Sequence, residues 1–179
     1  MDRELARTEN RLSVGGIKLS PELVLFKYSR RIHQPCALLS ALRTLSRQQI
    51  NIFFLSQSLY AEKSSVTTNF CTLPEYTDTT LAALTGMKPA GKNITIHSTV
   101  GALSIYPHKH NFSLLGKVLS TLVGDGLPIN GLCTSVSALS ILTDFSQYDA
   151  ALSALAKVLD LPDNHSPFRQ EFRIRQISP

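Results

Sequence analysis

The chain has 179 residues, of which 43% are hydrophobic and 17% are charged, a composition that is typical of a folded globular protein and excludes a disordered one. No run of 18 apolar residues predicts a membrane span. The formal net charge is +5, but the basic residues gather near the two ends and alternate with apolar positions, so we expect neither a nucleic-acid partner nor a membrane.

The cysteines and the first residues predict a cytoplasmic protein. Cys36, Cys71 and Cys133 stand far apart without a CxxC pair, which favours reduced thiols over a disulfide framework. The first seven residues carry mixed charge and no apolar run, so they do not resemble a secretory signal.

Residues 1–15 are predicted to form a polar N-terminal arm, and residues 16–98 a first folded unit. Gly15 and Gly16 break the chain before a short strand around Ile17 and Leu19. The apolar and alternating patterns then predict strands and helices in the order strand, helix, strand, strand, helix, strand. Their expected ranges are 23–26, a helix at 36–47 after a loop at 29–35, then 50–55, 65–72, a helix at 77–84, and 94–98.

Residues 99–179 are predicted to form a second unit with the same order of elements. Asn111 is a good N-cap for the helix that follows a polar loop. The expected elements are a strand at 100–106, the capped helix at 112–123, strands at 129–134 and 138–143, a helix at 147–160, and a last strand in which Phe168, Phe172 and Ile174 alternate with arginines. Whether this last strand, at 172–177, completes the second unit or crosses to the first is left open.

Two local repeats support the duplication. Residues 78–84, DTTLAAL, match residues 149–155, DAALSAL, and each unit has a helix that runs into an Ile-Asn pair, at Ile50-Asn51 and Ile129-Asn130. Such self-similarity defines the architecture. The sequence predicts an α+β fold of two ferredoxin-like βαββαβ units in tandem, with helices on one face of antiparallel sheets. Exposed sheet edges invite pairing, so we expect the units to pair with each other or in a homodimer.

Catalytic and metal signatures are weak. The sequence has no GxSxG, P-loop or paired-carboxylate pattern, so we expect no enzyme and no cofactor. His108 and His110, with His97, could suggest a metal site or a small enzyme, but no carboxylate or thiol lies beside them and structural zinc needs four ligands. We interpret them as loop histidines. Cys36 at a helix start is interpreted as a small buried residue.

The helix-to-strand joints at 48–52 and 126–131, Gln57, and the strand–helix pair at 137–159 resemble those of ACT domains. The chain is most similar to the paired ACT region at the C-terminal end of aspartate kinases, over roughly residues 16–177. The resemblance implies a regulatory protein that binds a free amino acid where two such domains pair. Exposed N–H groups at a helix start would attract its carboxylate.

Carried onto this sequence, the resemblance implies ligand-binding residues in each unit. In the first unit they are His33, Gln34, Pro35, Cys36, Ile50, Asn51 and Gln57. In the second unit they are His110, Asn111, Phe112, Ser113, Ile129 and Asn130. From the residues alone, the two strand-start asparagines could equally cap turns, and Gln57 is interpreted as a surface or sheet-edge amide.

The resulting hypothesis is a non-catalytic regulatory protein that senses a free amino acid or similar small metabolite, forms a homodimer, and acts on a partner enzyme or transporter. The alternative is an ACT-like dimerisation or docking module without a ligand. Family members commonly have a glycine at the helix entrance where this chain has Cys36 and Phe112, which favours the alternative. The two polar loops favour the sensor.

Overall fold

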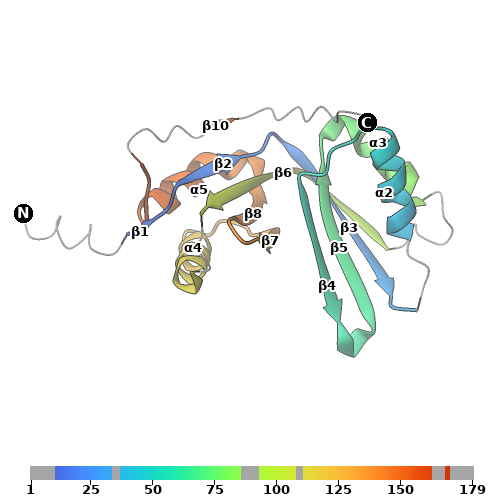
Figure 1. The fold of residues 1–179 in the computed structure, drawn as a ribbon, viewed down its shortest axis with the longest axis horizontal. Coiled ribbons are helices and arrows are strands. Elements are labelled where there is room, and N and C mark those ends of the chain that lie inside the picture. The colour runs from blue at the N-terminus through green and yellow to red at the C-terminus, as the bar shows by residue number, and fades with distance from the viewer. Residues whose placement is uncertain (1–10, 34–36, 86–92, 108–110, 163–167, 170–179) are drawn as a thin grey trace, which may run out of the picture.

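The protein contains one large bent sheet built around a single long strand (Figure 1). We describe a computed structural model over residues 11–33, 37–85, 93–107, 111–162 and 168–169. The sheet has eight strands, and a separate short sheet pairs β1 (Leu12–Ser13) with β9 (Leu159–Asp160). Together with the four helices of the described residues it forms a mixed α/β structure with a sheet-rich core.

The first half of the sheet carries two helices on one face. Its strands are β3 (Leu23–Arg31), β4 (Phe54–Tyr60), β5 (Ser65–Thr72) and the first part of β6 (Ile94–Tyr106), in the spatial order β6-β3-β5-β4 with antiparallel neighbours. The helices are α2 (Ala37–Arg47) and α3 (Thr77–Thr85), with short 3-10 turns at Ala61–Lys63 and Pro74–Tyr76. Leucines of both helices pack on Phe26 and Phe70, whose rings stack with centroids 5.4 Å apart.

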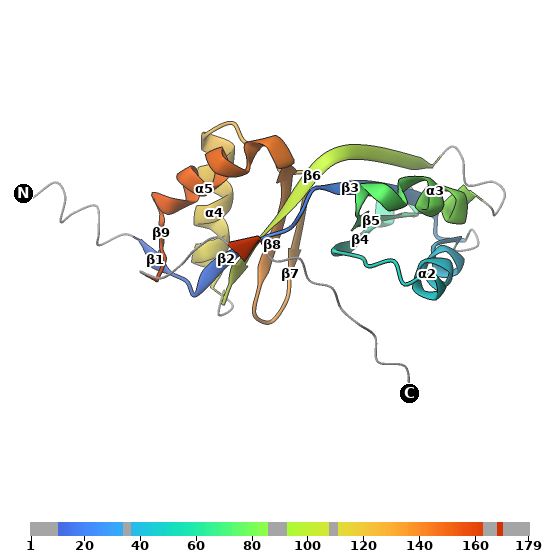
Figure 2. The same cartoon turned by 90° about the horizontal axis from the view of Figure 1, so that it is seen from above.

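The second half repeats this arrangement. The second part of β6 pairs with β8 (Leu139–Asp144) and β2 (Gly16–Leu19), and β8 pairs with β7 (Gly131–Thr134), giving the order β2-β6-β8-β7. Helix α4 (Phe112–Gly124), and helix α5 (Tyr148–Ala156) after a 3-10 turn at Phe145–Gln147, cover one face. Figure 2 shows the two helix pairs on separate halves, with β6 running between them.

The fourth strand of the second half comes from the N-terminal end of the chain. Ile17 and Leu19 of β2 pair with Ile105 and Leu103 and are buried in the second core, although the sequence analysis grouped residues 16–19 with the first unit. The pattern of a four-residue apolar strand shows which face is buried but not which strand is its partner. β10 (Phe168–Arg169) pairs parallel with β2 on its outer side. Residues 172–177 lie outside the described part, and the division into units at residues 98 and 99 stays a prediction.

The two halves share a third hydrophobic cluster, which we call the seam. It lies on the face opposite the helices of the first half and consists of Leu23, Leu25, Phe54, Cys71, Val100, Ala102 and Leu142. The predicted strands at 94–98 and 100–106 are one continuous strand, β6, which contributes to both halves. The halves are therefore joined both by a shared strand and by shared packing.

Several predicted elements differ from the observed ones. The strand expected at 50–55 is shifted to β4, an edge strand, and Ile50 lies in the connection before it. The apolar residues of 50–53 pack against the core of the first half and against the seam without forming a strand. β3 extends through Arg31 into the expected loop, and α5 ends at Ala156 instead of residue 160. The strand at 65–72 and the helix that starts at 112 are confirmed.

None of the helices in the described ranges has the length and apolar character needed to cross a bilayer.

Candidate functional site

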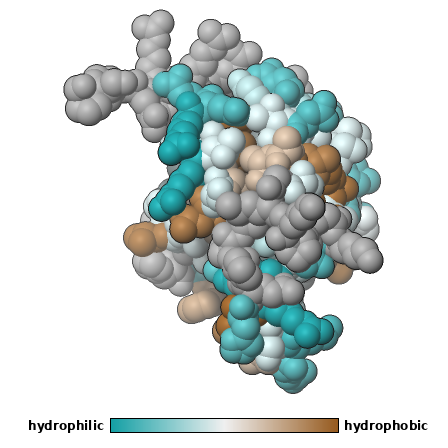
Figure 3. Space-filling view, turned by 90° about the vertical axis from the view of Figure 1, so that its right-hand side faces the viewer, coloured by the Kyte–Doolittle hydropathy of each residue, from teal (hydrophilic) through white to brown (hydrophobic). Residues whose placement is uncertain are grey.

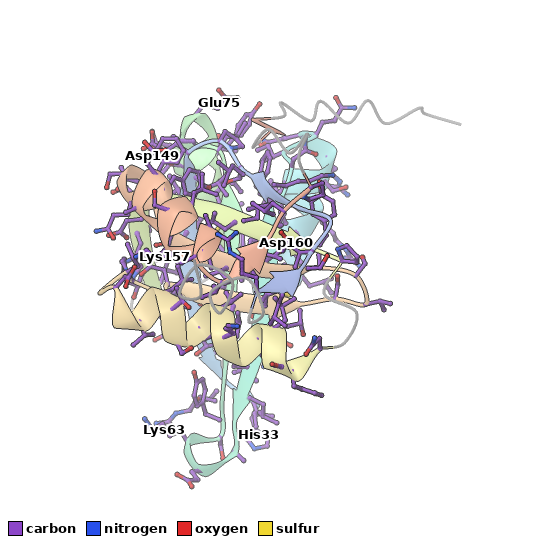
Figure 4. The ribbon with its side chains drawn as sticks, turned by 90° about the vertical axis from the view of Figure 1, so that its left-hand side faces the viewer. His33, Lys63, Glu75, Asp149, Lys157 and Asp160 are labelled. Atoms are coloured by element: carbon purple, nitrogen blue, oxygen red, sulfur yellow. The ribbon has the colours of Figure 1, made fainter. Side chains whose placement is uncertain are left out.

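The helix entrance of the first half lies at the outer end of the sheet. His33 follows β3, is exposed, and lies near Lys63 at the tip of the β4–β5 hairpin (Figure 4). The amide of Ile32 donates to the carbonyl of Ser64 across this tip, with an N···O distance of 2.9 Å. Three of the predicted ligand-binding residues, Gln34, Pro35 and Cys36, lie outside the described residues.

The strand entrance of the first half presents the exposed side-chain amide of Asn51. Asn51 is exposed, whereas Ile50 is only 6% exposed and belongs to the core beneath α2. Gln57 lies within β4, and its Nε2 donates to Thr68 Oγ1 on the neighbouring strand at 2.9 Å. This bond fits the interpretation of Gln57 as a sheet-edge amide, while Asn51 keeps its side chain at the surface.

The helix entrance of the second half is organised around a cap. Asn111 Oδ1 accepts hydrogen bonds from the amides of Ser113 and Leu114, at 2.9 and 3.2 Å, which satisfies two donors of the first helical turn. Phe112 is 85% exposed and Ser113 is also exposed. His110 lies outside the described residues. The predicted N-cap is thus confirmed, and the cap occupies two N–H groups of the first helical turn that a ligand carboxylate would otherwise contact.

The strand entrance of the second half lies at the seam. Asn130 Nδ2 donates to Asp144 Oδ1 at 2.9 Å, and its backbone amide donates to the carbonyl of Leu142 at 2.7 Å. Ile129 packs partly buried against the second core. Asn130 therefore orients a partly buried carboxylate, a role that the sequence analysis did not assign. Its partner is 14 residues away on another strand, so no local pattern indicates the pair.

Within the first half, the two predicted groups of site residues lie at opposite ends. β3 and β4 run parallel because each pairs antiparallel with β5. β4 starts at Phe54, which is level with Leu25 of β3, and Asn51 lies before that start. His33 follows the end of β3 beyond Arg31. The strand from Leu25 to Arg31 spans about 20 Å at about 3.3 Å per residue. One copy of this half therefore cannot close a small-molecule site with both groups.

The second half is arranged in the same way. β6 and β7 are parallel because each pairs antiparallel with β8. Asn130 precedes β7 at the seam, and Asn111 follows β6 at the outer end. The two strand entrances meet at the seam, where a Cβ on Gly131 would lie 3.3 Å from Phe54 Cζ. The strand entrances thus lie centrally, and the helix entrances lie at the two far ends.

Tyr148 forms a buried polar network that the sequence analysis missed. Its hydroxyl lies 3.0 Å from Ser20 Oγ and donates to the carbonyls of Ala102 and Ser20, at 3.1 and 3.3 Å. Burial raises the pKa of Tyr148 to about 12, and its hydrogen bonds to Ser20 and Ala102 oppose that shift. Its helical spacing predicted a core position only. The hydrogen-bonding partners lie 46 and 128 residues away, which local patterns do not reveal.

Comparison by sequence finds no relative. No protein-family profile matches the chain, and no curated protein sequence matches it significantly.

Comparison by structure finds the same fold in regulatory parts of aspartate kinases. The chain is similar to the ligand-free regulatory subunit of aspartate kinase from Thermus thermophilus, with a TM-score of 0.70 and 17% identity over 82% of this chain and 99% of that one. It is similar to aspartate kinase from Synechocystis, with a TM-score of 0.67 and 19% identity over 86% of this chain but 28% of that one. A third similar structure is E. coli aspartokinase III with lysine and aspartate, with a TM-score of 0.60 and 15% identity over 85% of this chain and 34% of that one. The predicted resemblance is confirmed at the level of the fold: this chain is folded like the regulatory region of aspartate kinases.

Proposed function

We propose that the chain is a non-catalytic regulatory protein built from two ferredoxin-like, ACT-type units, and that it binds a free amino acid where units of two copies meet. The orders β6-β3-β5-β4 and β2-β6-β8-β7 support this assignment. Each corresponds to the 4-1-3-2 order of a βαββαβ sandwich with both helices on one face. In the second unit, β2 takes the place of the fourth strand.

The separation of the site residues within each unit is the observation that carries the proposal of a shared site. An antiparallel pairing of β4 with β4 of a second copy places the start of one strand beside the end of the other. This pairing brings Asn51 of one copy toward His33 of its partner. In the second unit, an antiparallel pairing of β7 with β7 of a second copy would likewise bring Asn130 of one copy toward Asn111 of the other. Two half-sites that lie at least about 20 Å apart in one copy come to the same end of the paired sheet.

The surface next to the free edge supports such pairing. On the helix-bearing side of the first unit, Leu39 of α2 and Leu59 of β4 are 55% and 64% exposed, and Leu55 is also exposed. Figure 3, which views the side that carries α2 and α3, shows apolar patches among hydrophilic side chains. Unpaired edges with apolar flanks are sites of association. A homodimer would cover these side chains and satisfy the backbone groups of β4.

The proposed ligand is a free amino acid. The start of a helix offers N–H groups to a carboxylate, although at α4 Asn111 already accepts from two of them. The amide oxygen of Asn51 at the facing strand entrance offers an acceptor for an ammonium group. The similar E. coli aspartokinase III was crystallised with lysine and aspartate, and the similar Thermus thermophilus chain is a regulatory subunit. By analogy, the complex of chain and ligand would control a partner enzyme.

A thermal-shift panel of the protein amino acids on the full chain tests the proposal. A ligand at about 100 times its Kd should stabilise the folded state by about 2.7 kcal/mol. Asn51→Ala should abolish the shift, while Gln48→Ala, an exposed amide in the same connection, should retain it.

Sedimentation of the same samples separates the two hypotheses. A dimer that responds to no amino acid would support the docking module without a ligand. A chain that stays monomeric at all concentrations and binds nothing would contradict both.

A further inference from the structure

The shared strand β6 contains a bulge where it passes from one half of the sheet to the other. Leu25 pairs with His97 and Leu23 pairs with Val100. Two residue steps on β3 thus correspond to three on β6, so one extra residue is accommodated at Ser98–Thr99. A bulge of this kind bends its strand and increases the local twist.

The bulge is held by a residue that disfavours the required conformation. Thr99 has a φ of 60°, in the left-handed region that β-branched residues rarely adopt. Its hydroxyl donates to the carbonyl of Ser98 at 2.7 Å. The strain of a residue held in such a region typically disfavours that conformation, relative to an unstrained one, by a factor of about 5 to about 150. The surrounding structure must therefore impose this conformation on Thr99.

The buried contacts near the bulge are made by the residues that flank it and not by the bulged residues themselves. His97, Ser98 and Thr99 are exposed, so no packing surrounds the strained residue itself. The restraint comes from the flanking pairs and from the seam, where Leu23 and Val100 are fully buried. The two halves, which also share the packing of the seam, are thus joined along β6 through a short, exposed and strained segment, a place where a hinge can absorb a change of backbone direction.

We propose that the Ser98–Thr99 bulge is the joint that sets the angle between the two halves of the sheet, with the bulged form in equilibrium with a relaxed form in which Thr99 leaves the left-handed region. Relaxation removes the extra residue from the register between β3 and β6, which changes the direction of β6 beyond Val100. It would move the strand entrance at Asn130 relative to that at Asn51. This equilibrium is a property of the chain whether or not an amino acid binds.

Three glycine substitutions in the full-length chain test the joint. Thr99→Gly removes the strain and should hold the bulged form. Gln49 and Ser64 also have positive φ, 56° and 44°, but lie outside β6. Gln49→Gly and Ser64→Gly are therefore matched controls that relieve similar strain elsewhere. All three should raise the midpoint of thermal unfolding, but only Thr99→Gly should slow amide exchange at residues 100–102, by about fivefold or more.

Thr99→Val tests the opposite direction, because it keeps the β-branch and removes the hydroxyl that bonds to Ser98. It should speed exchange at residues 100–102 and change the relative orientation of the halves in residual dipolar couplings. Thr99→Ser, which keeps the hydroxyl without the β-branch, serves if the valine variant does not fold, and it should slow exchange. The proposal is overturned if Thr99→Gly changes the amide exchange rate at residues 100–102 no more than the two control substitutions do. It is also overturned if no Thr99 variant alters the orientation of the halves.

Discussion

The hydroxyl of Tyr148 connects the N-terminal strand to the second half of the sheet, and Tyr148→Phe should weaken that connection. The hydroxyl contacts Ser20 Oγ and the carbonyls of Ser20 and Ala102. Two of these three oxygens keep another partner, since the amide of Ser20 donates to the carbonyl of Ala102 and Ser20 Oγ accepts from the amide of Ala102. The substitution therefore removes hydrogen bonds while these two oxygens stay paired, and only the carbonyl of Ser20 loses the bond that Tyr148 gives it.

The expected loss of unfolding free energy follows from these contacts. A typical intramolecular hydrogen bond contributes about 0.5–1.5 kcal/mol, and the hydroxyl proton can serve one acceptor well at a time. We expect Tyr148→Phe to lose about 1–2 kcal/mol at neutral pH, measured by urea unfolding. Amide exchange of β2 should accelerate more than that of β8, because Ser20 directly follows the β2 strand.

The same residue should leave a signature at high pH. Because burial raises the pKa of Tyr148 from 10.0 to about 12, the phenol stays neutral in the folded state while it ionises in the unfolded chain. Stability is thus retained below pH 10 and lost as the pH rises toward 12. At about 1.4 kcal/mol per pKa unit, less a discount for solvent screening, the loss is about 2 kcal/mol. Burial of Cys71 raises the pKa of its thiol from 9.0 to about 12. This adds a loss of stability at high pH that the wild-type chain and Tyr148→Phe share.

Urea unfolding of the wild-type chain and Tyr148→Phe at pH 8, 10 and 11.5 checks both expectations. The difference between the two proteins should shrink as the pH rises, because only the wild type loses the contribution of Tyr148. Tyr106→Phe, a matched change on β6, should follow the wild type throughout. A variant that equals the wild type in stability at pH 8, or a difference that does not change with pH, would refute the reasoning.

Three further substitutions probe the cap, a close contact and the core. Asn111→Ala should lower the unfolding free energy by about 1 kcal/mol, whereas Asn111→Asp should retain it, since a carboxylate also accepts the two amide bonds; equal losses would contradict the cap. Gly101→Ala should cost about 1–3 kcal/mol, because its Cβ would lie within 2.2 Å of Tyr148 Oη, and an unchanged thermal midpoint would contradict that contact. Phe26→Ala should cost about 3–5 kcal/mol through loss of its buried stack on Phe70, and a loss below about 2 kcal/mol in urea unfolding would show that the site is less tightly packed.

The sequence predicted best those elements whose signals are local. The alternation at residues 65–72 identified β5, and Asn111 before an amphipathic helix identified the start of α4. The duplicated segments at 78–84 and 149–155 both fall in the helices that follow a central strand, α3 and α5. Period, capping chemistry and repetition are properties of adjacent residues, so one sequence is enough to read them.

The predictions failed where a distant contact decides the outcome. Ile50 reads as the start of a buried strand, but its burial comes from packing beneath α2, and the real strand is the more polar β4. Ile17 and Leu19 pair with β6, which lies some 85 residues later, and apolar alternation carries no information about the partner. The separation of His33 from Asn51 depends on the parallel course of β3 and β4, which only the topology defines.

That separation has a thermodynamic consequence for the proposed sensor. If a complete site needs the helix entrance of one copy and the strand entrance of another, ligand binding and dimerisation are linked, and each must promote the other by the same factor. The apparent affinity for an amino acid should then rise with protein concentration through the monomer–dimer transition, and the ligand should shift sedimentation toward the dimer. Titration calorimetry at protein concentrations below and above that transition measures the effect. Leu59→Lys, at an exposed side chain of the edge strand β4, should weaken dimerisation and ligand binding together. A variant that is monomeric yet binds with unchanged affinity would show that one copy holds a complete site, and that the half-sites inferred from the sheet register are not the ones the ligand uses.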